Sequence, residues 1–228
     1  MKTVVLPTQD AVCAAAEDIL SIVCAKPDCV LAVSGGEDEL AALRCAAELA
    51  EERGISMDGI RIFAACEFCG DGDGTVTRQI RRSLGGAYKG EISTPREDHC
   101  AGYDAAIEQA GGIDLAVLGL GEGASVAFNE LATQYDTHTH VQKLTNRIKA
   151  EWAHLFGGAD GVPPFGVTLG FKNICSARRI VVVALGVRRC DAVFNMLYGR
   201  NDSVYPAAFL QLPLEVCLFA DEDAAARL

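Results

Sequence analysis

Short apolar runs alternate along this chain with longer segments of helical periodicity. A run that is apolar throughout, rather than at every second residue, is typical of a strand buried on both faces of a parallel sheet. The periodicity predicts strands at 29–33, 60–65, 114–118, 166–169, 180–185 and 215–219, and helices at 10–23, 37–53, 75–84, 100–109 and 188–197. The alternation predicts an α/β fold, a Rossmann-like three-layer sandwich whose mainly parallel sheet has helices on both faces.

The composition predicts one compact domain over residues 1–228. Half of the residues are hydrophobic, enough for a substantial core, and no repeat or Pro/Gly/Ser linker divides the chain. The longest apolar run, 180–185, is far shorter than the roughly 20 residues that a membrane helix needs. Residues 1–7 lack the apolar core and cleavage site of a signal peptide. We therefore expect a cytoplasmic protein without a membrane partner.

The net charge and the cysteine content limit the classes of ligand that this chain is expected to bind. The formal net charge of −11 argues against nucleic acid as a ligand, and an anionic substrate would need a local basic pocket. The ten cysteines are scattered through apolar segments, as expected of small buried hydrophobes in a reducing compartment. The sequence indicates a small-molecule ligand and no cofactor, and it leaves a homo-oligomer open.

The most informative motif is the glycine-rich loop 119–130, GLGEGASVAFNE, which follows the strand that begins at 114. Backbone amides in such a loop can approach a small ligand closely, and a nearby carboxylate can act on it. The loop resembles the signature of the glucosamine-6-phosphate deaminase/isomerase family, Gly-x-Asp-Gly-His-Ile-Ala-Phe-Asn-Glu. Residues 127–130 match this signature, whereas Gly123 and Ser125 replace its Asp and first His.

The resemblance implies that Glu130 belongs to a proton relay that opens the sugar ring. Ser125, which replaces the relay histidine, can hold a hydrogen bond but cannot shuttle protons near neutral pH. Together with Gly121 and Gly123, it is expected to contact sugar hydroxyls. A purely structural alternative is that residues 128–130 form a packed helix start with an Asn cap.

A second strand end, residues 63–70, resembles the family segment Phe-x-x-Asp-Glu-Tyr-x-Gly. In the family this Asp moves the C2 proton; Cys66 takes its place here and Glu67 preserves the second acid. A thiolate can serve as a base when nearby positive charge lowers its pKa, and a buried inert thiol is the favoured alternative. The Cys66-x-x-Cys69 spacing also matches redox and zinc motifs, but no second cysteine pair accompanies it, so we predict no metal.

Two further strand ends resemble the family's phosphate site. Ser34, Gly35 and Gly36 match a turn whose amides cradle the sugar phosphate at a helix N-terminus. Glu37 stands where the family's turn has a Thr or Ser hydroxyl. Its charge would repel a phosphate ~4 Å away by about 4 kcal/mol. This repulsion raises the question of whether the ligand is phosphorylated.

Residues 184–189 resemble a strand end followed by Gly-x-x-Lys, which places Arg189 at the family's phosphate-binding lysine. The family's second phosphate ligand, an arginine, corresponds to His154. In the segment 137–140 both histidines would share one face of a strand and could suit a metal. Exposed histidines are the favoured interpretation, because no carboxylate or thiol is close in sequence.

Two function classes follow from the resemblance, which extends nearly end to end. The first is an enzyme of amino-sugar or sugar-phosphate metabolism that interconverts an aldose and a ketose through an enediolate, with or without ammonia release from glucosamine- or galactosamine-6-phosphate. The second is a non-catalytic paralogue that binds a sugar or related metabolite, as a sensor does. Five replaced positions in one pocket favour the second class or a shifted substrate.

Overall fold

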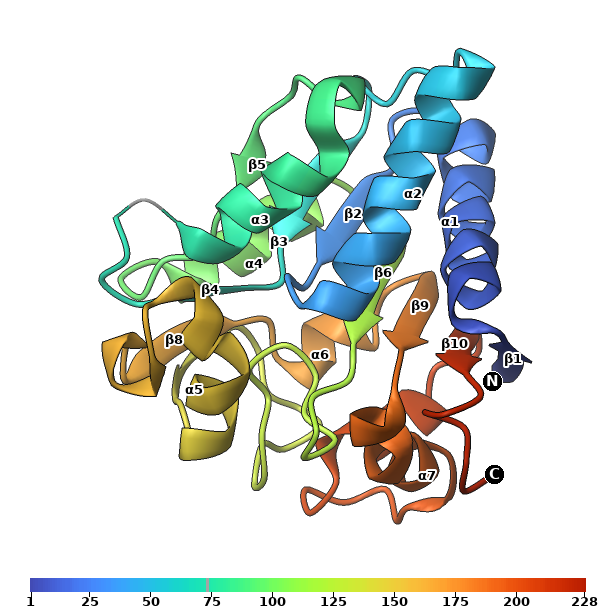
Figure 1. Cartoon of the computed structure of the whole chain (residues 1–228). Helices are drawn as coiled ribbons and strands as arrows, with labels where there is room; N and C mark the ends of the chain where they lie inside the picture. The colour runs from blue at the N-terminus through green and yellow to red at the C-terminus, as the bar shows by residue number, and fades with distance from the viewer. Residues whose placement is uncertain (73) are drawn as a thin grey trace.

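A seven-stranded parallel sheet forms the centre of the computed structural model, which describes residues 1–72 and 74–228 (Figure 1). The strand order is β1-β10-β9-β6-β2-β3-β5, and every neighbouring pair is parallel. Its strands are β1 (Lys2–Leu6), β2 (Val30–Val33), β3 (Arg61–Ala64), β5 (Ile92–Ser93), β6 (Leu115–Gly119), β9 (Arg179–Ala184) and β10 (Val216–Asp221). The prediction of a mainly parallel α/β sheet is confirmed.

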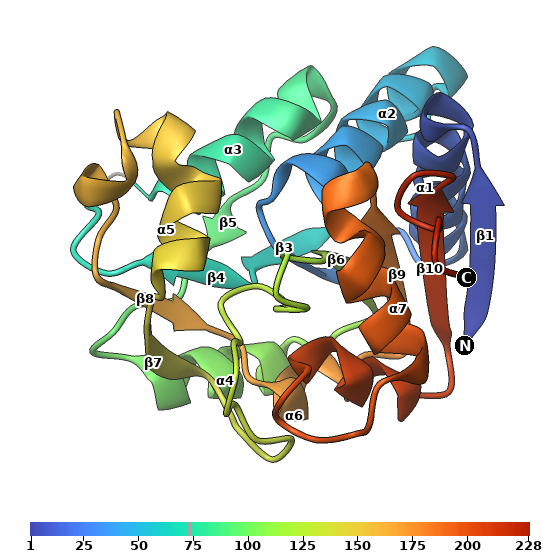
Figure 2. The same ribbon diagram turned by 60° about the horizontal axis from the view of Figure 1, so that its bottom comes forward.

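Helices cover both faces of this sheet. They are α1 (Thr8–Ala25), α2 (Glu37–Arg53), α3 (Thr75–Leu84), α4 (Cys100–Gln109), α5 (Asn146–Trp152), α6 (Phe171–Ile174) and α7 (Cys190–Tyr198). Figure 2 shows α2 and α3 above the sheet and α4 and α6 below it. The predicted helices 37–53, 75–84 and 100–109 are confirmed, whereas residues 187–189 form a separate 3₁₀ turn before α7.

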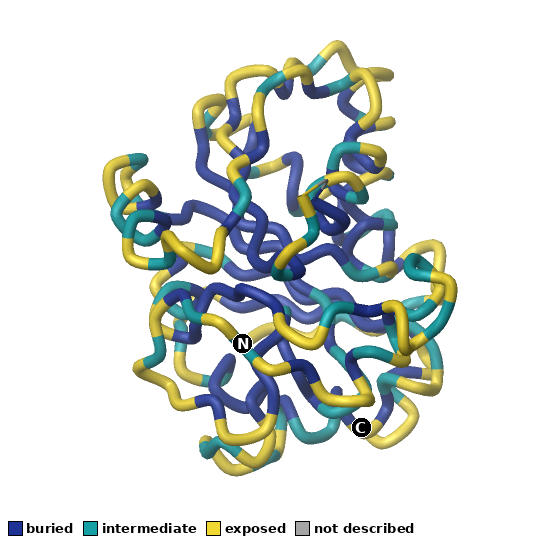
Figure 3. Tube along the Cα trace, turned by 90° about the vertical axis from the view of Figure 1, so that its left-hand side faces the viewer, coloured by how far each residue is buried: buried dark blue, intermediate teal, exposed yellow. Residues whose placement is uncertain are grey.

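Alternate residues of the strands divide the core into two layers. Leu31 and Val33 of β2 pack with α1, α2 and α3, and their neighbours Val30 and Ala32 pack with α4, α6 and α7. Figure 3 shows the buried residues concentrated along the central strands and the exposed ones at the outer turns. Because both faces of β2 are covered, the strand is apolar throughout, as the sequence pattern indicated.

A second, antiparallel sheet stands beside the main one. Its order is β4-β8-β7, with β4 (Cys66–Phe68), β8 (Phe165–Thr168) and β7 (His140–Lys143). The predicted strand at 166–169 therefore lies outside the parallel sheet. Short 3₁₀ helices complete the structure at Gly85–Ala87, Ala153–Leu155, Ala159–Gly161, Val187–Arg189 and Pro206–Gln211.

The register of β2, β6 and β9 brings the loops of interest to one edge. Val33 lies opposite Val117, and Gly119 lies opposite Val183, so the three strands end together. Among the described residues, no helix is long and apolar enough to cross a membrane. The extent of the domain, 1–228, stays a prediction.

Candidate functional site

Residues 34–36 form the turn between β2 and α2, the glycine turn, and a carboxylate of the chain itself binds to it. The Gly36 N–H and the Ser34 hydroxyl donate to Oε1 of Glu39, at 2.7 and 2.6 Å. Ser34 Oγ in turn accepts the Gly119 N–H at 3.2 Å. A Cβ at Gly119 would lie 2.1 Å from the Glu39 carboxylate, so only glycine fits there. Burial raises the pKa of Glu39, and the hydrogen bond from Ser34 opposes this rise.

A cleft of about 450 Å³ opens in front of this turn. It brings together five residues predicted from sequence, namely Gly35, Gly36, Glu37, His154 and Arg189. It also contains residues that sequence reasoning did not place in the site, namely Asp38, Glu122, Glu151, Trp152, Arg188 and Asp223. The carboxyl ends of the central strands are where open α/β sheets bind ligands.

Arg189 is held between two carboxylates of the cleft. Its Nε lies 3.3 Å from Oδ2 of Asp38 and its Nη1 lies 3.4 Å from Oε1 of Glu151. Burial raises the pKa of both acids, and the attraction of Arg189 opposes this rise. Burial alone would lower the pKa of Arg189, but the two carboxylates raise it. Arg189 is therefore a cation whose charge is already balanced.

Glu37 and His154 lie at the mouth of the cleft. The Glu37 carboxylate is 3.6 Å from Nε2 of His154, and 80% of the Glu37 side chain is exposed. Water screens a charge in this position, so its repulsion of an anion is weaker than the sequence suggested. Arg189 contacts Asp38 and Glu151, and neither of these acids is Glu37.

The thiol of Cys66 is fully buried in β4. Burial, Glu67 and Glu39 together raise its pKa well above the ordinary value. A thiolate base needs positive charge nearby, and each charged neighbour that acts on Cys66 is a carboxylate. The geometry thus favours the inert-thiol interpretation.

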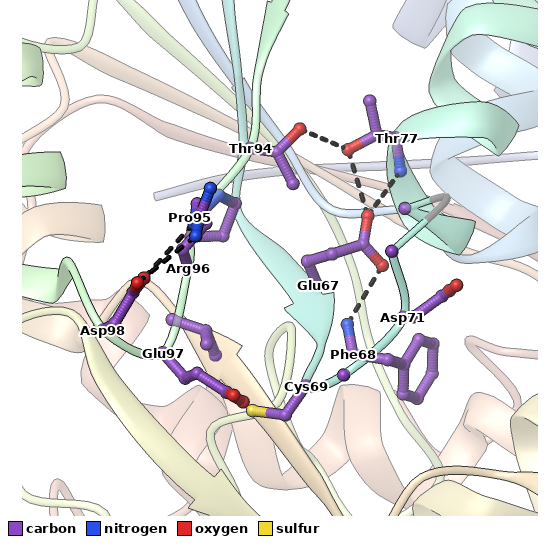
Figure 4. Close-up of a pocket in the computed structure, with 14 residues that line it drawn as sticks. Glu67, Phe68, Cys69, Asp71, Thr77, Thr94, Pro95, Arg96, Glu97 and Asp98 are labelled. Atoms are coloured by element: carbon purple, nitrogen blue, oxygen red, sulfur yellow. Dashed lines mark hydrogen bonds and ion pairs between the residues drawn. The ribbon is translucent and has the colours of Figure 1, made fainter.

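Glu67 holds the N-terminus of α3. Its carboxylate accepts the N–H groups of Phe68 and Thr77 at 3.0 and 2.9 Å and the Thr77 hydroxyl at 3.0 Å (Figure 4). It also accepts the N–H of Val76 at 3.0 Å. Acids at a helix N-terminus are stabilised by the unpaired amides and by the helix dipole. This carboxylate therefore has a structural task.

The cavity drawn in Figure 4, about 500 Å³, lies beside Glu67 and is separate from the cleft at the glycine turn. Cys69 faces Glu97 there; burial and the hydrogen bond to Glu97 raise the pKa of Cys69 to about 12. Within residues 1–72 and 74–228, no group of three or more His, Cys, Asp or Glu side chains is arranged to hold a metal ion. His138 instead lies 3.4 Å from Asp104, ahead of the strand that His140 begins.

The last residues of the signature loop, 127–130, bind it by hydrogen bonds to the segment after β8 and to the start of α5. Asn129 is fully buried and donates to the carbonyls of Leu169 and Val126 at 2.7 and 3.0 Å. Glu130 accepts the N–H of Thr145 at 3.0 Å and also its hydroxyl, and Thr145 caps α5. Residues 128–130 are not helical, so the structural alternative of a helix start is wrong.

Close contacts explain the small residues of this loop. A Cβ at Gly121 would lie 2.0 Å from Ser125 Oγ, and one at Gly123 would lie 2.1 Å from Nη1 of Arg147. The Arg147 guanidinium thus fills the space where the resemblance expects an acid. Gly121, Gly123, Ser125, Glu130 and Cys66 line neither of the two cavities described above.

Comparisons with known sequences agree with these motifs. The family model for glucosamine-6-phosphate isomerases/6-phosphogluconolactonase matches residues 7–217. The glucosamine-6-phosphate deaminase of Mycolicibacterium smegmatis is 31% identical over 242 residues, covering 100% of this chain and 93% of that protein. The deaminase of Halalkalibacterium halodurans is 37% identical over 125 residues, covering 55% of this chain and 51% of that protein.

Solved structures show the same fold. A monomeric glucosamine-6-phosphate deaminase superposes with a TM-score of 0.91 at 24% identity, covering 99% of both chains. The 6-phosphogluconolactonase of Trypanosoma cruzi superposes with a TM-score of 0.74 at 17% identity, covering 100% of this chain and 96% of that one. By the family match and the full-length relatives, this chain belongs to the family of glucosamine-6-phosphate isomerases and 6-phosphogluconolactonases.

Proposed function

We propose that this family member binds an unphosphorylated aldose or amino sugar in the cleft at the glycine turn, without catalysing the isomerisation and deamination for which its relatives are named. The observation that carries this proposal is the placement of Arg189 between Asp38 and Glu151. A phosphate would have to displace a carboxylate from Arg189, the partly buried cation of the cleft, whereas a neutral or cationic ligand would not.

The charge of the cleft supports the same ligand class. Five carboxylates line it against two arginines, a formal balance of −3 with His154 neutral. Two unit charges of like sign ~4 Å apart near a protein surface repel by about 4 kcal/mol, roughly a thousandfold in affinity. Sugar hydroxyls can donate to these carboxylates, and a free amine can pair with one of them.

The groups that would move protons support a binding role. A general base is most effective with a pKa near the working pH, and burial raises the pKa of the Cys66 thiol well above it. Glu67 accepts four hydrogen bonds, three of them from the start of α3, and Glu130 accepts two from the cap of α5. Each acid at a catalytic position is therefore engaged in holding the fold.

The family reaction itself is the second candidate, and the full-length likeness favours it. A glucosamine-6-phosphate deaminase is 31% identical across 100% of this chain. In this alternative, Arg189 would exchange its carboxylate partners for the phosphate of the substrate. Either function belongs to carbohydrate metabolism and suits the cytoplasm.

Calorimetric titration separates the two candidates. Glucosamine and galactosamine are compared with their 6-phosphates, and ammonia and ketose formation is followed in parallel. The proposal expects the free sugars to bind more tightly than the phosphates and no turnover of either. Tighter binding of a 6-phosphate, together with turnover that Glu130→Gln and Cys66→Ala both abolish, would establish the family reaction instead.

A further inference from the structure

A pair of thiols joins α1 and α2, away from the cleft. The two helices lie side by side on one face of the main sheet (Figures 1 and 2). Cys13 of α1 and Cys45 of α2 approach each other with 3.8 Å between their sulfur atoms. Both residues are partly exposed, and the Gln9 amide donates to Cys13 Sγ at 3.6 Å.

At this separation the Cys45 thiol donates a hydrogen bond to Cys13 Sγ, whereas the sulfur atoms of a disulfide bond are about 2.05 Å apart. Closing the remaining gap requires the sulfur atoms to move by less than ~2 Å, which side-chain rotation and small helix adjustments supply. Both thiols project from helices that pack directly on each other, so the pair is held in place. Their partial exposure gives a small oxidant access.

We propose that Cys13 and Cys45 are a redox-active thiol pair that a low-molecular-weight disulfide, such as oxidised glutathione, converts to an intramolecular disulfide. One thiolate attacks the small disulfide, forms a mixed disulfide with the protein and releases the first small thiolate. The second protein thiol loses its proton, attacks the protein sulfur and releases the second. Two protein thiols are oxidised and one small disulfide is reduced to two thiols.

Cys13 makes the first attack. Burial, the hydrogen bond between the two thiols and the charges of Glu48 and Glu17 raise the pKa of Cys45 to about 11. The thiolate is the nucleophile, and the Cys45 thiol keeps its proton while it donates to Cys13 Sγ, so the first attack comes from Cys13. Cys45 then acts as the resolving thiol, and its fixed position beside Cys13 gives it the advantage over a second small thiol.

Non-reducing peptide mapping of the full chain tests the proposal. The protein is incubated with oxidised glutathione, free thiols are blocked with N-ethylmaleimide, and the digest is analysed by mass spectrometry. A peptide linking Cys13 to Cys45 is expected, with a rise in Tm on the order of 5–10 °C because the bond closes a loop of about 30 residues. Recovery of the two cysteines in separate, unlinked peptides would overturn the proposal.

Single variants test the order of attack. Cys45→Ser is expected to retain one stable glutathione adduct on Cys13, while Cys13→Ser forms an adduct on Cys45 at least tenfold more slowly. Cys24→Ser, which removes an exposed thiol from the same helix α1, is the matched control and should form the Cys13–Cys45 bond as the native chain does. Loss of that bond in Cys24→Ser would contradict the pairing, and equal adduct rates would contradict the order.

Discussion

Asp38 and Arg189 meet across the cleft although 151 positions separate them in sequence. The carboxylate comes from the first turn of α2 and the guanidinium from the 3₁₀ turn after β9. The same Asp38 oxygen accepts the Leu185 N–H at 3.1 Å, so one carboxylate fixes the loop backbone and balances the cation. The Asp38 carboxylate therefore both positions the Arg189 side chain and neutralises its charge.

Asp38→Asn should make the charge of Arg189 more available to an anionic ligand. The amide oxygen can still accept the Leu185 N–H, but the charge that competes with an anion is gone. Removing one like charge ~4 Å from a bound anion is worth up to about 4 kcal/mol before screening, so affinity for glucosamine-6-phosphate should rise at least tenfold. Calorimetry with the phosphorylated and free sugars measures the change.

Glu215→Gln is the matched control for this substitution, because it also removes one negative charge, from an exposed acid that pairs with Arg179. It should leave both affinities unchanged. Equal gains in phosphate affinity for the two variants would show that net charge, not the contact with Arg189, governs the cleft.

Glu130→Gln should cost stability. The substitution turns an amide donor toward the N–H and hydroxyl of Thr145, which both need an acceptor. Losing a cap interaction of this kind destabilises by about 1–2 kcal/mol. Urea denaturation measures the loss, and Glu91→Gln at an exposed position should stay within roughly 0.5 kcal/mol of the native chain. If the Glu130→Gln variant were as stable as the native chain, Glu130 would have no structural role and would return as a candidate catalytic residue.

Glu39→Gln should alter the pH dependence of stability. Burial raises the pKa of Glu39 in the folded chain, so the folded state binds its proton more tightly than the unfolded state does. The native chain therefore gains stability from this group as the pH falls through the raised pKa and loses it as the pH rises. Denaturant titrations should find Glu39→Gln more stable than the native chain at pH 8, with the difference closing toward pH 4.

Asp114→Asn should change the pH dependence of stability in the opposite direction to Glu39→Gln. Burial alone would raise the pKa of Asp114, but hydrogen bonds from Lys26 and the Val30 amide and the charge of Arg178 lower it. Its contribution is present above the ordinary carboxyl pKa and is lost as the pH falls through the lowered folded value. This variant should be less stable than the native chain at pH 8 and approach it in strong acid. The same pH trend in both variants would refute the assignment.

Cys66 should resist alkylation in the folded chain. Its side chain is fully buried and burial raises its pKa, so both access and thiolate are lacking. With iodoacetamide at pH 8, followed by peptide mass spectrometry, Cys66 should react at least a hundredfold more slowly than the exposed Cys24. Comparable rates would restore Cys66 as a candidate base.

The parallel sheet was predictable because its inner strands are apolar on both faces. Strand β1 was missed, since it is an outer strand with an exposed, irregular pattern, and β5 was missed because it has only two residues. Helix α5 was missed as well, although Thr145 as its cap and the buried Ile148 and Trp152 at spacing four were readable signals.

Gly35, Gly36, His154 and Arg189, which line one cleft, were predicted as site residues from their motifs, but the carboxylate partners of Arg189 were not. Glu151 lies on the missed helix α5, 38 positions from Arg189. Asp38 and Glu39 stand in the first turn of α2, where acids are common, so the sequence does not distinguish them as partners of the site. Long-range pairing decides which charges remain available to a ligand, and a strand-and-helix pattern carries no information about it.

The side chain of Glu39 occupies the hydrogen-bond donors of the glycine turn, as a bound anion would. A group fixed in one geometry can reach an effective concentration on the order of 10⁵ M or more, far above that of any free metabolite. A dissolved anion must therefore outcompete a tethered one before the Gly36 amide and the Ser34 hydroxyl can serve it. If the proposed function holds, Glu39 in the first turn of α2 adds to the selectivity against anions that the carboxylates lining the cleft provide.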